Sequence, residues 1–481
     1  MNLRLVIRAL GVLLLCEAAA MLPAVLISRG YGEDTVPALL LSILVTAVAG
    51  ILLCLPQVKD KVIRYKEGFA IVTFGWLLVS LAGALPFLFA GVLPSFVDAF
   101  FETVSGFTTT GATVIPDVES VPYSLLFWRS FTHWLGGMGI LVLALAVLPA
   151  LGMGTFQILK AESPGPVSAK LTPRVSSTAK ILYSIYLVIT VAQILLLRAG
   201  GMPWFDSVVN SFATLGTGGY AIKNVSIGAY NNLYFEIVIT VFMLLAGVNF
   251  SLYYLAVRKR SLSDFFHDTE FRLYIGIIAA YILIITLNIY GNNYSSLAES
   301  LRHASFQVAS IITTTGFTTT DFNLWPDLSR ALLLTLMFIG ACAGSTGGGM
   351  KVIRIYLLMQ YIRREVNSLI HPRAVKAIKV NNIPLQESVL TNVLGFTVLY
   401  FIIFIIAGLL LLTQKYDMIT AFSAVAATLS NIGPGLGLVG PSTTCAGLTA
   451  FSKIVLSFCM ILGRLEIYTV VALLLPQTWK R

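Results

Sequence analysis

The sequence predicts an all-α integral membrane protein, in which an N-terminal two-helix hairpin precedes four helix–loop–helix repeats around one central axis. Hydrophobic residues fill 57% of the 481 positions and charged residues only 11%, a balance that soluble globular proteins of this size do not show. Apolar runs of about 20 residues, enough to cross a bilayer as a helix, recur along the chain. A polar segment that ends in glycine recurs four times between these runs.

Residues 1–56 are expected to form the hairpin. The apolar stretches Ala9–Ser28 and Pro37–Leu55 are each long enough to span a bilayer. A cleavable signal peptide is the alternative for the first stretch, but Glu17 is unusual in the core of a signal sequence. We therefore predict that the first stretch is a retained span.

Four repeats are expected to follow, at residues 57–160, 161–262, 263–375 and 376–481. Each contains a first apolar span, a short amphipathic helix, a glycine loop and a second apolar span. The predicted first spans are Phe69–Val92, Ile181–Ala199, Leu273–Tyr290 and Val389–Leu412. The predicted second spans are Leu125–Leu148, Leu233–Val257, Leu328–Tyr361 and Phe451–Leu475.

The net charge of +10 comes from short clusters of Lys and Arg between the spans rather than from one polar face. Such clusters are typical of cytoplasmic loops, so we expect each repeat to leave the cytoplasm and return, with both termini cytoplasmic. The same distribution argues against nucleic-acid binding. The five cysteines show no C-x-x-C spacing, which argues against a zinc site or a disulfide framework.

The four glycine segments align with one another. Each follows an acidic residue by 13 to 17 positions, which suits a helix of about three turns that begins at the acid and ends at the glycine. Four partly negative helix ends that converge on one axis would favour a cation there, although each acid can also be a simple surface cap. The segments are "VSGFTTTG" (Val104–Gly111), "FATLGTGG" (Phe212–Gly219), "ASIITTTG" (Ala309–Gly316) and "AATLSNIG" (Ala426–Gly433), and the acids are Asp98, Asp206, Glu299 and Asp417.

Irregular loops at membrane depth are tolerated only where protein covers them or where they line a water-filled cavity. Glycine allows left-handed backbone angles, which lets successive carbonyls face one side, and the threonines add hydroxyl groups. A ring of oxygens from four loops can replace the water shell of a dehydrated alkali cation. The segments therefore predict a cation pathway.

Five further stretches carry a family resemblance: "TTTGAT", "TTTGFTTTDFN", "THWLGGMGI", "GSTGGGMK" and "GRLEIYT". With them, nearly the whole chain resembles the TrkH/TrkG family, the membrane subunits of bacterial Trk potassium uptake systems. This family belongs to a superfamily of potassium transporters built from joined channel-like repeats. The resemblance implies four helix–pore loop–helix repeats around one central pore, in the bacterial inner membrane, with potassium as the transported ion and no organic cofactor in the chain.

The resemblance also implies which residues form the selectivity filter. None of the four loops keeps the T-V-G-Y-G of strict potassium channels, so we expect a looser preference for potassium over sodium. The implied residues are Thr109, Thr110 and Gly111; Thr217, Gly218 and Gly219; Thr314, Thr315 and Gly316; and Asn431, Ile432 and Gly433.

A gate is expected where "GACAGSTGGGMK" (Gly340–Lys351) interrupts the second span of the third repeat. Three consecutive glycines break a helix, and broken helices at mid-membrane usually line a cavity; close packing of small residues is the alternative. Arg464 lies within the last predicted span, where a charge is costly, and either forms a barrier to cations or pairs structurally. The resemblance implies an intramembrane gating loop with Gly344, Ser345, Thr346, Gly347, Gly348, Gly349 and Lys351, together with Arg464 as a pore arginine.

No nucleotide-binding motif is present in the sequence, so any nucleotide control must come from another protein. The resemblance implies a homodimer and a cytosolic TrkA-type nucleotide-binding ring. A membrane enzyme would need clustered His, Asp or Glu, and the four histidines are scattered. A less selective Na/K channel and a cation symporter remain as alternatives.

Overall fold

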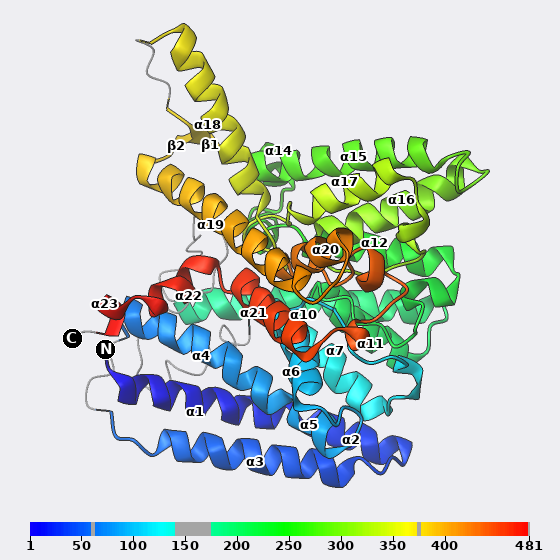
Figure 1. Cartoon of the computed structure of the whole chain (residues 1–481), viewed down its shortest axis with the longest axis vertical. Coiled ribbons are helices and arrows are strands. Elements are labelled where there is room, and N and C mark those ends of the chain that lie inside the picture. Colours follow the sequence, from blue (N-terminus) through cyan, green and yellow to red (C-terminus); the bar gives the residue numbers. More distant parts are fainter. Residues whose placement is uncertain (59–62, 140–174, 373–376, 480–481) are drawn as a thin grey trace.

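The computed structural model describes all residues except 59–62, 140–174, 373–376 and 480–481, and the described part is almost entirely helical. Six helices are long and apolar enough to cross a membrane, and two bent helix pairs raise the number to eight in the part of the chain that is described. The protein is thus a multi-pass membrane protein. The two termini lie at the same end of the long helices (Figure 1).

The expected N-terminal hairpin is present. Helix α1 (Leu3–Ala20) continues into α2 (Leu22–Tyr31), and α3 (Val36–Cys54) returns beside α1. Glycines allow the close approach, because a Cβ atom on Gly11 would lie only 2.7 Å from the carbonyl oxygen of Gly50. Helix α1 also packs on α4, so the hairpin is attached to the rest of the bundle (Figure 1).

The four predicted first spans are continuous helices, and each leads to a short helix that precedes a glycine segment. Ser95 and Asp417 cap two of the short helices with their side chains, while Asp98, Asp206 and Glu299 lie in first turns. The first spans are α4 (Tyr65–Gly83) with α5 (Leu85–Phe89), α10 (Val175–Ala199), α15 (Thr269–Ile289) and α19 (Glu387–Leu412). The short helices are α6 (Phe96–Phe107), α11 (Trp204–Leu215), α16 (Leu297–Ile312) and α20 (Met418–Leu429).

The second spans differ from the sequence prediction, which placed a break in the third repeat alone. The pair α12 (Leu233–Ala246) and α13 (Phe250–Lys259) bends by 90°, and the pair α21 (Ala450–Arg464) and α22 (Ile467–Leu474) bends by 112°. The first bend follows from local chemistry, since the Asn249 side chain caps α13 and restarts the helix. At the second bend Glu466 adopts a left-handed φ of 55°, which ends the helical path.

The remaining second spans are α7 (Tyr123–Gly137) and, in the third repeat, α17 (Asp327–Met337) and α18 (Val352–Ile370), which the expected glycine-rich loop separates. In the first repeat, the predicted second span continues to Leu148, and its last part, residues 140–148, lies outside the described residues. Short elements complete the fold: α14 (Ser263–His267), α23 (Pro476–Trp479), the antiparallel strands β1 (Lys379–Val380) and β2 (Ile383–Pro384), and the 3-10 helices η1 (Val118–Ser120), η3 (Ser226–Tyr230), η4 (Phe322–Leu324), η5 (Gly437–Val439) and η6 (Cys445–Gly447).

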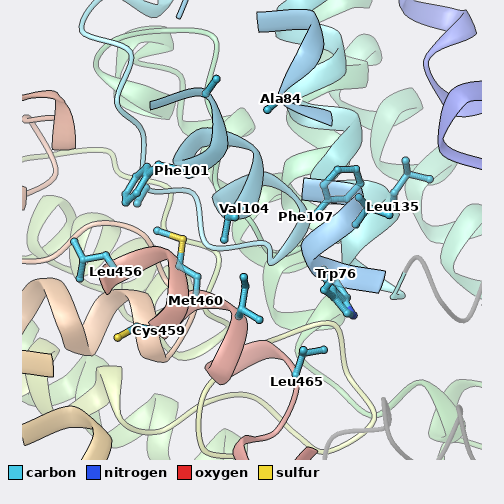
Figure 2. Packing of buried hydrophobic residues seen from close by; sticks show 14 of the residues in the cluster. Trp76, Ala84, Phe101, Val104, Phe107, Leu135, Leu456, Cys459, Met460 and Leu465 are labelled. Carbon is cyan, nitrogen blue, oxygen red and sulfur yellow. The ribbon is translucent and has the colours of Figure 1, made fainter. Parts of the chain in front are cut away.

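The largest hydrophobic cluster holds short helix α6 in place. Figure 2 shows Phe101, Val104 and Phe107 of α6 beside Met460 of α21 and Trp76 of α4. All five side chains are fully or almost fully buried. Because a close-packed interior resists small displacements, this packing fixes the position of the glycine segment that follows α6.

Candidate functional site

The four glycine segments fold into the same loop. In each, the residue two positions before the terminal glycine has a left-handed φ, and so does the glycine itself. A left-handed threonine or asparagine is uncommon, so its occurrence at the same place four times is a shared structural feature. The φ angles are 56°, 54°, 57° and 57° at Thr109, Thr217, Thr314 and Asn431, and 83°, 74°, 83° and 102° at Gly111, Gly219, Gly316 and Gly433.

The backbone hydrogen bonds repeat as well. In every loop the N–H before the terminal glycine donates to the carbonyl five residues earlier, which ends the short helix and turns the chain. This bond satisfies a carbonyl that would otherwise be left free at the end of the helix. The donor and acceptor pairs are Thr110 and Ser105 (2.8 Å), Gly218 and Ala213 (2.9 Å), Thr315 and Ser310 (2.9 Å), and Ile432 and Ala427 (2.7 Å).

The four loops meet in a closed ring, which we call the glycine ring (residues 109–111, 217–219, 314–316 and 431–433). A Cβ atom on any of its terminal glycines would overlap a carbonyl oxygen of the next loop, so glycine alone fits these places. The overlaps run around the ring: Gly111 with Gly218 O (1.9 Å), Gly219 with Thr315 O (2.0 Å), Gly316 with Ile432 O (1.9 Å), and Gly433 with Thr110 O (2.5 Å). The residues that the sequence predicts as one site are therefore together in space.

A cavity lies on each side of the glycine ring. One, of about 150 Å³, touches all four terminal glycines and is also lined by Arg129 and Lys223. The other, of about 100 Å³, is lined by the glycine-rich loop (Gly340–Lys351) and by Arg464. The ring thus separates two spaces, each large enough for several water molecules.

The glycine-rich loop packs directly against the glycine ring. The N–H of Gly348 donates to the Thr314 hydroxyl at 2.7 Å, and a Cβ atom on Gly348 would lie 2.6 Å from the Ser430 carbonyl oxygen. The glycines therefore do allow close packing, which was the alternative to a cavity lining, yet the same loop also lines the second cavity. The two interpretations of the sequence describe one arrangement.

Lys351 and the two ends of the loop are firmly held. Ile339 and Met350 form a bridge, and the N–H of Gly340 donates to the Met350 carbonyl at 2.8 Å. Lys351 is only 1% exposed, and its ammonium group donates to the Gly347 carbonyl. This buried cation is thus bound within the loop itself.

Arg464 joins three elements around the second cavity. It ends α21 rather than lying inside a continuous span, and its guanidinium donates to the Thr346 carbonyl at 2.8 Å and to the Thr109 hydroxyl at 3.3 Å. It also donates to the Gly137 carbonyl, at the end of α7, at 2.8 Å. Arg464 therefore connects the glycine-rich loop, the first loop of the glycine ring and the end of α7.

Sequence reasoning missed three acidic residues near the site. Glu466 forms an ion pair with Arg354 of α18. Glu270 of α15 accepts the N–H of Ala343, inside the glycine-rich loop, and the N–H of Ile353, just beyond it. Glu102 of α6 pairs with Arg129 of α7. A charge inside an apolar span was a signal for Glu466 alone, because Glu102 lies in a short amphipathic helix and Glu270 precedes the predicted span Leu273–Tyr290.

The pair of Glu102 and Arg129 fastens two loops of the glycine ring. The two side chains are 0% and 2% exposed and lie 2.6 Å apart. The Glu102 carboxylate also accepts the N–H of Val114 at 2.8 Å, just after the first loop, while Arg129 donates to the Ala221 carbonyl at 2.9 Å, just after the second loop. The pair therefore connects the chain beyond both loops.

We expect Glu102→Gln to lower the free energy of unfolding by about 3–5 kcal/mol, because it leaves a buried guanidinium without its countercharge. Thermal unfolding of the purified protein in detergent measures the effect. Glu119→Gln is the matched control, since Glu119 pairs with Lys223 on an exposed surface and its loss is expected to leave the unfolding temperature unchanged. Equal losses in the two variants would contradict a special role of the buried pair.

Comparison with known proteins gives the family of the chain. The family model described as "TrkH: Cation transport protein" matches residues 37–479. The chain is 40% identical to the Trk system potassium uptake proteins TrkH of Halomonas elongata and of Escherichia coli K12, over the full length of both chains. It is 34% identical to TrkG of E. coli K12, with 100% of this chain and 99% of that protein covered.

A solved structure also matches. The crystal structure of the potassium transporter TrkH from Vibrio parahaemolyticus has a TM-score of 0.90 and 39% sequence identity, and each chain is covered completely. Agreement of family model, sequence and fold over the same length leaves one conclusion. The chain belongs to the TrkH family of cation transport proteins.

Proposed function

We propose that this protein takes up potassium across the bacterial inner membrane as the membrane subunit of a Trk system. The glycine ring is its selectivity filter, with a ligand set drawn from residues 109–111, 217–219, 314–316 and 431–433. The printed names of the TrkH relatives support potassium as the ion. The observation that carries the proposal is the closed ring, in which the terminal glycine of each loop lies against a carbonyl oxygen of the next loop of the same chain.

Electrostatics supports a cation at this centre. The four short helices all end at the glycine ring, so the partly negative carboxyl end of each helix lies beside the ring. Fixed carbonyl dipoles can replace the hydration shell of an ion without moving far. In this proposal the chain consists of an N-terminal hairpin and four channel-like repeats, at residues 57–160, 161–262, 263–375 and 376–481, around one pore.

The glycine-rich loop and Arg464 form the gate in this proposal. They lie on one side of the ring, line the same cavity and bind each other, so cations meet Lys351 and Arg464 in that space. Control comes from a cytosolic TrkA-type ring that binds nucleotide, and the protein acts as a homodimer. Both termini are cytoplasmic, which agrees with their position at one end of the bundle (Figure 1).

A less selective Na/K pathway is the second candidate, and one observation favours it. The hydroxyl pairs of the first and third loops, Thr108 with Thr110 and Thr313 with Thr315 at 2.8 Å, are missing from the second and fourth loops, where the chain reads "GTGG" and "SNIG". A ring with unequal walls discriminates less sharply between cations of similar size. A coupled cation symporter shares the same ring.

Ion flux in liposomes tests the proposal. We expect the reconstituted protein to carry rubidium and potassium in preference to sodium, because the oxygen ring matches the larger, more easily dehydrated ions. Liposomes without protein are the control. Equal sodium and potassium flux would replace the first candidate by the second, and flux that requires a proton or sodium gradient would indicate symport. No cation flux in any condition would remove both.

A further inference from the structure

We propose that Glu270 is a latch that holds the glycine-rich loop in its closed position, and that the β1–β2 hairpin is the lever that acts on this latch. The inference rests on the proposed gate. It assigns a positioning role to a residue that touches neither the glycine ring nor the ion, and it names the path by which a cytosolic partner can reach the gate.

The first observation is a double hydrogen bond. One carboxylate oxygen of Glu270 accepts the N–H of Ala343 at 2.7 Å and the N–H of Ile353 at 3.0 Å. Ala343 lies inside the glycine-rich loop, while Ile353 lies just beyond it, in the first turn of α18. A single side chain therefore fastens both arms of the loop.

The second observation concerns what α18 lacks. Its N-cap residue Lys351 makes no side-chain capping bond, so the first N–H groups of the helix need another acceptor. Glu270 supplies it, and a carboxylate at a helix N-terminus is also favoured by the helix dipole. The residue is 6% exposed, and hydrogen bonds to an ionised carboxylate are about twice as strong as neutral ones. The start of α18 thus depends on Glu270.

The third observation connects this latch to the protein surface. Glu270 lies in the first turn of α15, next to Asp268 and Thr269. The side chain of Asn381, in the turn of the β1–β2 hairpin, accepts the N–H of Thr269 at 2.8 Å and donates to the Asp268 carboxylate at 2.9 Å. The hairpin therefore holds the very turn that carries Glu270.

The hairpin is attached to α18 as well. The Tyr356 hydroxyl donates to the Lys379 carbonyl at 3.3 Å. Ala343 and Ile353 belong to a small hydrophobic cluster with Ile378 and Leu390. The cluster joins the chain just before β1 to α18 and α19. In Figure 1 the two strands lie beside α18, which extends away from the other helices. A force on this exposed unit is thus transmitted to both sides of the latch.

Rubidium uptake into liposomes and hydrogen exchange of the full-length protein test the latch together. We expect Glu270→Ala to raise uptake at least threefold and to speed exchange in peptides that contain Ala343 and Ile353. Glu270→Gln keeps an acceptor oxygen but loses the charge, so its uptake is expected to lie between those of the wild type and Glu270→Ala. A damaged fold would lower the uptake, so the direction separates the latch from simple loss of structure. Uptake by Glu270→Ala that is unchanged or lower overturns the latch.

Two neighbouring residues of the hairpin provide a test variant and a matched control for the lever. Asn381 and Asn382 both have left-handed φ angles, 49° and 65°, which glycine adopts without strain. Asn381→Gly removes the two side-chain bonds to Asp268 and Thr269 but keeps the turn and the backbone bond from residue 381 to the Thr269 hydroxyl. We expect it to raise uptake and speed exchange in the same direction as Glu270→Ala. Asn382→Gly is expected to change neither. Equal behaviour of the two variants overturns the lever.

Arg464→Ala and Gly316→Ala in the same assay distinguish failure of the latch from failure of the proposed function. If Arg464→Ala raises uptake while Glu270→Ala does not, the latch is wrong and the proposed gate stands. If the wild type carries no rubidium and Gly316→Ala changes nothing, the proposed function is wrong, and hydrogen exchange still reports whether Glu270 holds the loop.

Discussion

Gly316→Ala is expected to lower potassium or rubidium flux at least about tenfold. The added Cβ atom would lie 1.9 Å from the Ile432 carbonyl oxygen, so the third and fourth loops must move apart. Alanine would also have to adopt a φ of 83°, and a left-handed conformation costs an L-residue about 1–2 kcal/mol. Both effects displace the backbone of the proposed filter. Flux into liposomes measures the result.

Gly276→Ala is the control for this variant. Gly276 lies in α15 of the same predicted repeat, and a Cβ atom there meets nothing within 4 Å. The substitution is again glycine to alanine, but neither a steric overlap nor the backbone conformation opposes it. Flux is therefore expected to equal that of the wild type. Flux that survives in Gly316→Ala, with the protein correctly folded, would show that the ring is not the ion pathway.

Arg464→Ala is expected to raise cation flux by about tenfold or more. The guanidinium holds the glycine-rich loop, the first loop of the ring and the end of α7 together through Thr346, Thr109 and Gly137. Hydrogen bonds to charged groups each contribute about 1.5–3 kcal/mol, so their loss shifts the gate strongly toward the open state. Removal of the charge also removes an electrostatic barrier to cations. Rubidium uptake measures the change.

Two further variants check the Arg464 result. Arg464→Lys keeps the charge but not the planar fork of donors, and its flux is expected to lie between those of the wild type and Arg464→Ala. Arg258→Ala removes an exposed charge from the last turn of α13, which is not part of the glycine ring, and is expected to leave flux unchanged. Unchanged or lower flux in correctly folded Arg464→Ala would exclude the barrier role.

Much of the architecture could be predicted because it depends on local patterns. Twenty apolar residues in a row indicate a span wherever they occur, and the predicted hairpin and first spans are present. The alignment of the four glycine segments also predicted that they share one structure, which their φ angles now show. These features needed no knowledge of how distant segments pack.

The rest depends on contacts between distant segments. Nothing in the neighbourhood of Glu466 indicates that it pairs with Arg354, more than one hundred residues away, and the bends after Ala246 and Arg464 arise from capping and packing rather than from a run of glycines. Glu270 resembles an ordinary first-turn acid until the glycine-rich loop is placed beside it. Roles that are made by tertiary structure leave little trace in local sequence.

The glycine ring has a consequence for experiment because its four walls belong to a single polypeptide. A substitution in a channel of four identical subunits alters every wall at once, whereas a substitution here alters one quadrant and leaves three intact. If the ring is the proposed filter, its ion preference can be changed one wall at a time. Asn431, which stands where the other three loops have threonine, is a natural example of such a one-wall change.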